Sequence, residues 1–340
     1  MGKVLLVVSL VSFGMAAPAR AQIFESVGIR AQGMGGAFVA IADDADAAWW
    51  NPAGLAGGAY FSAVIEYDTA QDPGHATDAD GVALPAWRSG ARGFTITFPS
   101  LGLSYYRLQV SQIQPFGATG ANELDRQDRG RAPVLLSSLL LQQFGTTVGQ
   151  SLGEHLVVGS TVRLVRGQFQ TAPSAAADAS LDRAAALDGH AETHVDVDVG
   201  AMAAFNTLRL GVAVKHVTQP SFSSGTDRAE LSRQARAGIS MTRRGGTVGP
   251  MTFAFDADLT RTPTAVGDVR HVASGAEAWL FRRRLGVRGG LTANTVGGAR
   301  ASGSIGASAA LRAGVYVDAH ATGGSDRTTN GWGLALRVTF

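Results

Sequence analysis

Residues 194–205 read HVDVDVGAMAAF, and their alternation decides the fold class. Valine, alanine and phenylalanine fill the odd-numbered positions, whereas His194, Asp196, Asp198 and Gly200 fill even-numbered ones. Because successive side chains of a strand point to opposite faces, the segment predicts a strand with one apolar and one polar face. The same period of two recurs in residues 234–242, 251–260 and 332–340.

The sequence contains about 14 segments of this kind. They cover residues 58–68, 91–98, 101–110, 134–146, 155–168, 192–205, 207–217, 231–243, 250–261, 269–281, 285–294, 300–309, 311–321 and 331–340. Long polar connections (69–90, 111–133 and 171–191) alternate with tight turns at Pro99-Ser100 and Asn206-Thr207. Short turns at one end, long loops at the other and an even strand number are typical of bacterial outer-membrane barrels.

The composition agrees with a surface that faces lipid. Charged residues make up 16 % of the chain, against roughly 25 % in soluble proteins, and glycine occurs 44 times. The absence of cysteine excludes disulfides and thiolate chemistry, and a net charge of +2 without a basic block argues against nucleic acid as a partner. A soluble β-sandwich would also show alternating strands, but would not explain the low charge and a secretory signal together. A propeller or solenoid would show a sequence repeat, and we find none.

The N-terminus predicts a signal peptide over residues 1–21. Lys3 precedes an apolar stretch, and Ala19-Arg20-Ala21 matches a cleavage site, which makes Gln22 the mature start. The predicted organisation is therefore a signal peptide (1–21), an N-terminal hatch (22–57) and a barrel (58–340). The predicted fold class is all-β: a closed antiparallel transmembrane β-barrel with a short helical hatch inside the lumen.

The hatch is predicted from an apolar segment that precedes the first strand and is too short to fold alone. Residues 36–50 are rich in alanine and have helical character, with three aspartates on a polar side. Pro52 cannot continue a helix and disfavours helical geometry at Asn51, so the chain should turn there. Trp49-Trp50 either packs the hatch against the wall or lines a ligand site, and both interpretations remain open.

Three stretches resemble the opening signature of the FadL/TodX and PorV-like outer-membrane proteins. They are residues 30–37 (RAQGMGGA), 42–44 (ADD) and 51–55 (NPAGL). The resemblance implies a 14-stranded barrel plugged by its hatch. Transporter members pass fatty acids or aromatic hydrocarbons, whereas PorV-like members are partners in protein secretion and surface attachment. The resemblance also implies that the C-terminal Phe340 is recognised by the barrel assembly machinery.

The candidate site residues follow from the hatch. The gating candidates are Gly33, Gly35, Gly36, Asp43, Asp44, Asn51 and Pro52, and the candidates for ligand contact are Trp49 and Trp50. Asp43, Asp44 and Asp46 lack the spacing of a calcium loop, and we expect them to cap the helix or pair with lumen arginines. Glu192, Asp196 and Asp198 and the histidines at 190 and 194 are possible metal ligands. We expect the loop end of this group to be exposed to solvent and the rest to face the lumen, and we predict neither metal nor cofactor.

Charged residues on the polar strand faces are expected to point into the lumen. They are Arg163, Asp196, Asp198, Arg209, Lys215, Arg236, Asp256, Asp258, Glu277, Arg288, Arg312, Asp318 and Arg337. They form either a network that braces the barrel or a polar ladder along a permeation path. Arg282-Arg283-Arg284 falls at a short turn, where we expect solvated side chains. Aromatic residues at strand ends, Phe61, Phe94, Phe98 and Trp332, predict an interfacial girdle.

The sequence therefore predicts a bacterial outer-membrane barrel that passes small hydrophobic molecules passively, gated by the hatch. The alternative is a PorV-like barrel that transports nothing and serves a secretion complex. The predicted partners are membrane lipid, a hydrophobic cargo, the assembly machinery and, in the alternative, a secretion-system protein. No Gly-x-Ser-x-Gly elbow occurs in a strand–turn–helix context, and we do not expect an enzyme.

Overall fold

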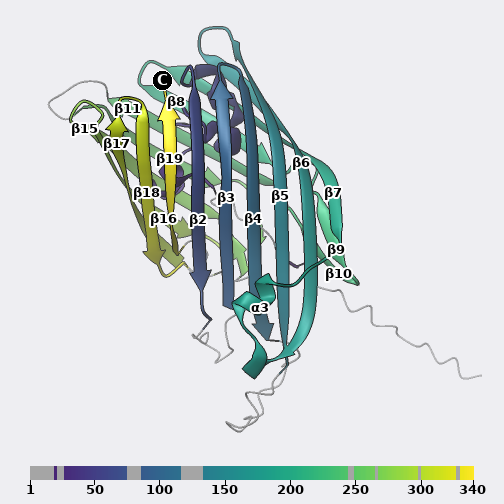
Figure 1. The fold of residues 1–340 in the computed structure, drawn as a ribbon. Helices are drawn as coiled ribbons and strands as arrows, with labels where there is room; N and C mark the ends of the chain where they lie inside the picture. Colours follow the sequence, from purple (N-terminus) through teal and green to yellow (C-terminus); the bar gives the residue numbers. More distant parts are fainter. Residues whose placement is uncertain are drawn as a thin grey trace, which may run out of the picture.

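The computed structural model describes residues 19–20, 27–74, 86–115, 133–243, 249–264, 267–297, 300–326 and 330–340. Fourteen antiparallel strands form one closed barrel, in which the last strand pairs with the first (Figure 1). Closure gives every wall strand a hydrogen-bonded neighbour on both sides. The predicted all-β barrel of about 14 strands is confirmed.

The wall strands fall where the alternating segments predict them. They are β2 (Ser62–Asp72), β3 (Ala86–Phe98), β4 (Leu101–Pro115), β5 (Pro133–Leu152), β6 (Leu156–Ala175), β7 (Ala191–Phe205), β8 (Leu208–Lys215), β11 (Gln234–Arg243), β12 (Met251–Asp258), β15 (His271–Leu280), β16 (Leu285–Asn294), β17 (Arg300–Arg312), β18 (Val315–Gly324) and β19 (Gly331–Thr339). The main difference is length, because β5 and β6 have 20 residues each, and β6 continues to Ala175, well past Gln168, where its pairing with β7 ends.

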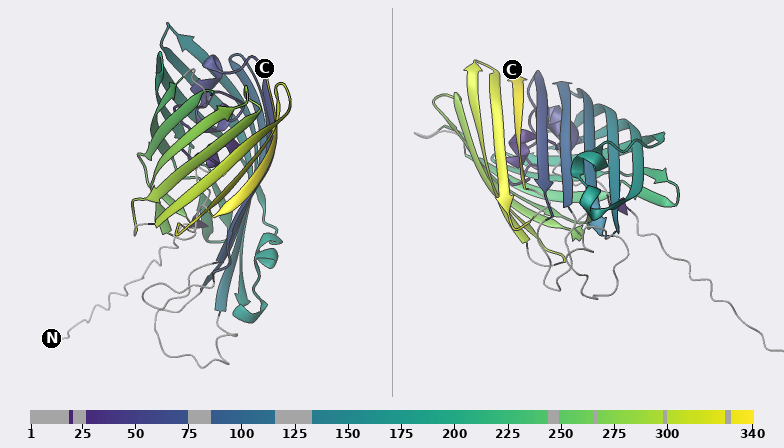
Figure 2. Two further views of the ribbon diagram at one scale, coloured as in Figure 1. Left: turned by 90° about the vertical axis from the view of Figure 1, so that its left-hand side faces the viewer. Right: turned by 60° about the horizontal axis from the view of Figure 1, so that its bottom comes forward.

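The long connections gather at one end of the barrel, and the tight turns and the C-terminus lie at the other (Figures 1 and 2). The long connections carry the short elements η4 (Ala176–Asp178), α3 (Leu181–Ala185), β9 (Ser221–Ser224), β10 (Asp227–Glu230), β13 (Thr262–Thr264) and β14 (Gly267–Val269). The β9–β10 hairpin folds inward, and its buried Phe222 packs directly on Gly167 of β6. The predicted alternation of short and long connections is confirmed.

The outer face of the wall is apolar. Exposed side chains include Ile65, Phe144, Leu164 and Phe255. Near the short-turn end, the Phe61 ring lies 5.5 Å from Phe98 and 6.4 Å from Phe340. Farther toward the long-loop end, the rings of Tyr67 and Trp332 lie 5.8 Å apart, so aromatic groups occur toward both ends, as the girdle prediction requires. Among the described residues, no helix is both long and apolar enough to cross a membrane.

The hatch lies inside the ring of strands (Figure 2). It contains α1 (Ile29–Gln32), α2 (Ala47–Trp50) and the 3-10 segment η2 (Pro52–Gly57). The predicted stop before Pro52 is confirmed, because α2 ends at Trp50 and Asn51 is extended. The predicted helix over 36–50 is mostly wrong: residues 37–46 form turns and irregular segments, in which Phe38 to Ala42 make one local turn and other backbone groups bond to the wall.

The predicted signal peptide lies outside the described residues except for β1 (Ala19–Arg20), which pairs in parallel with β10. The boundary at Ala21 therefore stays a prediction. The division between hatch and barrel at residue 57 also stays a prediction.

Candidate functional site

The candidate site is the interface between the hatch and the inner wall. The Gly33-Met34-Gly35-Gly36 turn shows why the signature is rich in glycine. Gly35 and Gly36 adopt left-handed geometry, with φ of 68° and 82°. A Cβ on Gly33 would lie 3.1 Å from the Cα of Gly306 in β17, and one on Gly35 would lie 2.9 Å from the Leu291 nitrogen in β16. Thr292 donates a 2.5 Å hydrogen bond to the Gly35 carbonyl, so the turn rests on the wall backbone.

The Asn51-Pro52 pair packs against a separate part of the inner wall. Two inward-facing glycines, Gly200 of β7 and Gly159 of β6, leave the space for it, since a Cβ on either would collide with Asn51 or Pro52. The Asn51 amide donates to the carbonyls of Val39 (2.9 Å) and Ala201 (3.3 Å), and its oxygen accepts from the Ala53 nitrogen. Asn51 therefore joins two parts of the hatch to each other and to the wall.

Arg30 is the charged centre of the hatch. Its guanidinium contacts Glu277 of β15 at 2.7 Å, Asp44 at 2.9 Å and Asp43 at 2.5 Å. Burial alone lowers the pKa of Arg30, but the three carboxylates outweigh burial and raise that pKa above its ordinary value. Asp43 and Asp44 thus pair with an arginine of the hatch itself, not with the lumen arginines that the sequence favoured. Asp46 does not cap α2 through its side chain; burial, then the charge of Asp44, raises its pKa.

A chain of buried charges continues from Arg30 across the wall. Glu277 also accepts from Arg288 Nε at 2.7 Å and from Trp279 Nε1 at 3.0 Å. Arg288 bonds to Ser308, Ser308 bonds to Asp318, and Asp318 binds Arg337 at 2.7 Å. These groups lie on β15 to β19 and are all buried. The arrangement matches the expected bracing network, and it attaches the hatch to that network.

Polar wall side chains also complete the hydrogen bonds of the irregular hatch backbone. Glu66 accepts from the nitrogens of Gly28 and Ile29, and Asp256 accepts from those of Phe38 and Val39 at 2.8 Å. Further bonds join Ser240 to the Ala40 carbonyl, Arg209 to the Ile41 carbonyl and Ser62 to the Ala45 nitrogen. Buried backbone groups without partners are costly, so the hatch depends on the wall for its conformation.

Both tryptophans are buried in the hatch–wall interface. The Trp49 ring has Lys215 Nζ 3.2 Å from its centroid and Arg163 4.9 Å away, with the Tyr106 ring edge-on at 5.4 Å. Trp50 donates from Nε1 to the Val27 carbonyl at 3.0 Å. The packing role is therefore present in this structure, and ligand contact by either tryptophan remains a prediction.

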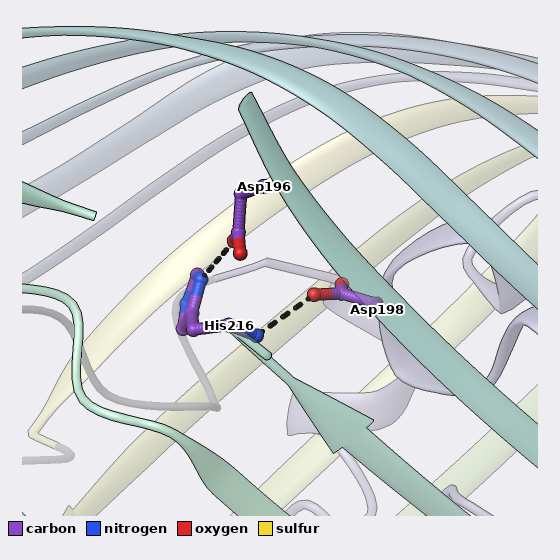
Figure 3. A group of neighbouring side chains, drawn as sticks. All are labelled: Asp196, Asp198 and His216. Atoms are coloured by element: carbon purple, nitrogen blue, oxygen red, sulfur yellow. Dashed lines mark hydrogen bonds and ion pairs between the residues drawn. The ribbon is translucent and has the colours of Figure 1, made fainter. Parts of the chain in front are cut away.

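Asp196, Asp198 and His216 form the one group with metal-ligand chemistry that we find in the described part of the chain (Figure 3). His216 bonds to Asp196 through Nδ1 at 2.6 Å and to Asp198 through its backbone nitrogen at 3.0 Å. Arg163 lies 2.7 Å from Asp198, and Thr218 donates to Asp196. Because protein donors and a fixed positive charge already occupy both carboxylates, we assign this group to hatch support.

Two cavities of about 450 and 410 Å³ lie between the hatch and the wall at the short-turn end. Both are lined by Arg30, Asp43, Arg209, Trp279 and Arg283. The opposite, long-loop side of the hatch meets apolar inward side chains, namely Leu108, Leu139, Leu141, Phe169, Phe222 and Leu231. The hatch thus lies between two cavities of mixed polarity, which contain charged groups, and an apolar part of the lumen.

The predicted lumen-facing charges are buried or partly buried, with one exception. Arg312 is exposed, because a β-bulge between Ala310 and Arg312 shifts the register of β17 and breaks its alternation. Glu66, the central position of Arg30 and the wall glycines were not predicted from the sequence. Glu66 could have been found, because it alternates with the outward-facing Ile65 and Tyr67 and must therefore point inward. Strand alternation does not show which residues an inward side chain contacts, so the other features could not be found in this way.

Comparison with known proteins supports the fold. No protein-family model and no curated protein sequence matches the chain. Among solved structures, it is similar to the Ralstonia pickettii toluene transporter TbuX, with a TM-score of 0.58, 15 % identity, and coverage of 93 % of this chain and 99 % of that one. It is also similar to the CymD monoaromatic hydrocarbon channel (TM-score 0.63, 13 % identity, 94 % and 99 % covered).

A Pseudomonas aeruginosa FadL homologue also matches, with a TM-score of 0.55 and 10 % identity over 95 % of this chain and all (100 %) of that one. Barrel and hatch are thus covered together. The resemblance found in the N-terminal signature is confirmed at the level of the fold.

Proposed function

We propose that the protein is a bacterial outer-membrane barrel through which small hydrophobic molecules cross passively, gated by the hatch of residues 22–57. The observation that carries the proposal is the whole-chain likeness in fold to a toluene transporter and a monoaromatic hydrocarbon channel. The apolar side chains on the long-loop side of the hatch support it, because burial of apolar surface would retain such a cargo.

The gate in this proposal is the hatch turn that rests on the wall. A reversible lock tests it, since the chain has no cysteine and a designed pair would be unique. Gly33 has no room for a side chain against Gly306, so the lock is placed where the hatch meets β2. Ser62 Oγ lies 3.1 Å from the Ala45 nitrogen, and Ala45→Cys/Ser62→Cys should form a disulfide that holds the hatch to the wall. We expect liposomes that hold the oxidised protein to take up toluene slowly, and reduction to restore uptake.

The single cysteine variants are the controls, because they carry the same substitutions without the crosslink. Equal uptake by oxidised and reduced protein would show that the hatch is not the gate. If the reduced variant and the wild-type protein both form intact barrels but take up no toluene, the result would contradict transport itself.

Location in the outer membrane and assembly through Phe340 belong to the same proposal. The apolar outer face and the terminal aromatic residue at the end of the closing strand support them. Membrane fractionation tests the location, and recovery of the mature chain as a water-soluble monomer without detergent would contradict it. Deletion of Phe340 should lower the amount of assembled barrel in cells.

The second candidate is a PorV-like barrel that serves as a partner in secretion or surface attachment. The observation that favours it is the dense attachment of the hatch, together with cavities in which arginines and carboxylates share the lining with apolar groups such as Trp279. Co-purification of a stable large complex from native membranes, with no hydrocarbon uptake in liposomes, would support this candidate over the first.

A further inference from the structure

A row of arginines crosses four neighbouring strands on the outer face of the wall. Arg92 of β3 pairs in register with Arg107 of β4, Arg107 pairs with Gln142 of β5, and Gln142 pairs with Arg166 of β6. Residues directly opposite on antiparallel strands have Cβ atoms roughly 5 Å apart. We call Arg92, Arg107 and Arg166 the arginine row.

The arginine row lies at the border of the apolar outer surface. Arg92 and Arg166 are exposed and Arg107 is half-buried, whereas their sequence neighbours Ala91, Tyr106 and Val165 are buried inside. Two residues closer to the short-turn end, the same outward positions hold Phe94, Tyr105, Phe144 and Leu164. Counted along its strand from the short-turn end, each arginine is therefore the first charged side chain that faces outward. Such a position is expected where the acyl chains of a membrane end and the lipid headgroups begin.

No carboxylate of the described residues neutralises the row. The β6–β7 connection covers the neighbouring surface, but its Asp182 binds Arg88 at 2.7 Å and its Asp188 accepts from Gln168. Like charges directly opposite on adjacent strands repel, and at a membrane border the repulsion is screened less than in bulk water. An anion from outside the described residues would therefore relieve the repulsion between Arg92 and Arg107.

We propose that the arginine row binds the phosphates of a glycolipid headgroup in the leaflet at the long-loop end of the barrel. Arg92 and Arg166 are three strand spacings apart, roughly 14 Å. That span is too wide for one phosphate and fits a sugar headgroup with a phosphate at each end. The planar guanidinium binds phosphate through two parallel hydrogen bonds, and Gln142 lies between the arginines as a partner for sugar hydroxyls. The inference rests on the proposed membrane location, and transport is not part of it.

Lipid binding to the detergent-solubilised mature protein tests the inference. The probes are diphosphoryl lipid A, the same lipid without its phosphates, and phosphatidylglycerol, with bound lipid measured by native mass spectrometry. The test variant is Arg92→Gln/Arg107→Gln/Arg166→Gln. The control, Arg282→Gln/Arg284→Gln/Arg312→Gln, removes three exposed arginines at the short-turn end. We expect wild type and control to bind diphosphoryl lipid A at least about tenfold more tightly than the test variant.

We also expect the wild-type protein to prefer diphosphoryl lipid A over both other probes. Equal affinity of the test variant and wild type would overturn the site, and equal affinity for phosphatidylglycerol would overturn the assignment to a glycolipid. If the triple variant does not fold, Arg107→Gln and the charge-preserving Arg107→Lys serve in its place, with loss expected for glutamine and substantial retention for lysine. Hydrocarbon uptake is measured separately: protein that binds the lipid but takes up no toluene contradicts the proposed function alone.

Discussion

Both ends of the hatch rest on wall glycines, but the N-terminal end also carries an arginine that is held in buried ion pairs. Around Arg30, the N-terminal end is attached to β15–β19 through buried charges. Around Asn51, the C-terminal end fits onto wall positions where only glycine leaves room, Gly159 and Gly200. We call these the charged end and the packed end.

The difference indicates which end can move. The packed end continues directly into β2, and shape complementarity of this kind has no alternative partner. The charged end is joined to the wall by the ion pair between Arg30 and Glu277 of β15. The exchange of charged partners is a common basis of two-state switches. The comparison therefore predicts that gating, where it occurs, begins around residues 27–36.

The largest effect is expected at the charged end. Arg30→Met leaves Glu277, Asp43 and Asp44 near one another without their shared cation, and breaking a buried ion pair costs about 3–5 kcal/mol. The free energy of unfolding in detergent should fall by that amount, and proteases should cut within residues 27–36. The control Arg88→Met breaks an exposed pair with Asp182 and should cost under about 1 kcal/mol. Equal costs for the two variants would contradict a charged anchor.

The next effect tests the packed end. Gly200→Val places a branched side chain where Asn51 and Pro52 lie, and overpacking of this kind costs about 1–3 kcal/mol. Gly323→Val is the matched control, because no atom lies within 4 Å of a Cβ at that strand position. Urea titration of both variants should show a loss for Gly200→Val well above that for the control. A Gly200→Val protein as stable as the control would mean that the hatch is loosely seated.

The sequence predicted the wall better than the hatch, for a physical reason. Strand alternation repeats over many residues, so β16 (Leu285–Asn294) matches its predicted range. The prediction failed locally where one extra residue in β17 breaks the period and turns Arg312 outward. Periodicity cannot reveal a bulge, because a bulge depends on the pairing of two strands.

The hatch was predicted as a helix from its alanines, but its conformation is imposed from outside. Asp256 accepts from the backbone of Phe38 and Val39, and bonds of this kind replace helical ones. The signature residues themselves were visible in the sequence, and the structure shows what they do: Gly35 and Asn51 make contacts with the wall. Their partners could not be predicted, because alternation gives the inward face of a strand and not the residue that it meets.

A smaller effect is expected from Asn51→Ala, which keeps the space and removes the hydrogen bonds. The change leaves the carbonyls of Val39 and Ala201 without the amide donor, for a cost of about 1–2 kcal/mol. Asn51→Asp keeps the acceptor for the Ala53 nitrogen but has no donor, so its loss of stability should be similar or larger. If Asn51→Asp is as stable as wild type by thermal unfolding in detergent, the hydrogen bonds donated by the Asn51 amide do not hold the hatch on the wall.

The smallest effect connects the two ends. Trp50 belongs to the packed end, yet its indole nitrogen donates to the carbonyl of Val27 at the charged end. Trp50→Phe keeps most of the ring and removes that bond, at about 1 kcal/mol. If the ends are coupled, Arg30→Met and Trp50→Phe together should deviate from additivity by at least about 0.5 kcal/mol in a double-mutant cycle. Additive costs would mean that the two ends are released independently, and gating by residues 27–36 would then leave the packed end in place.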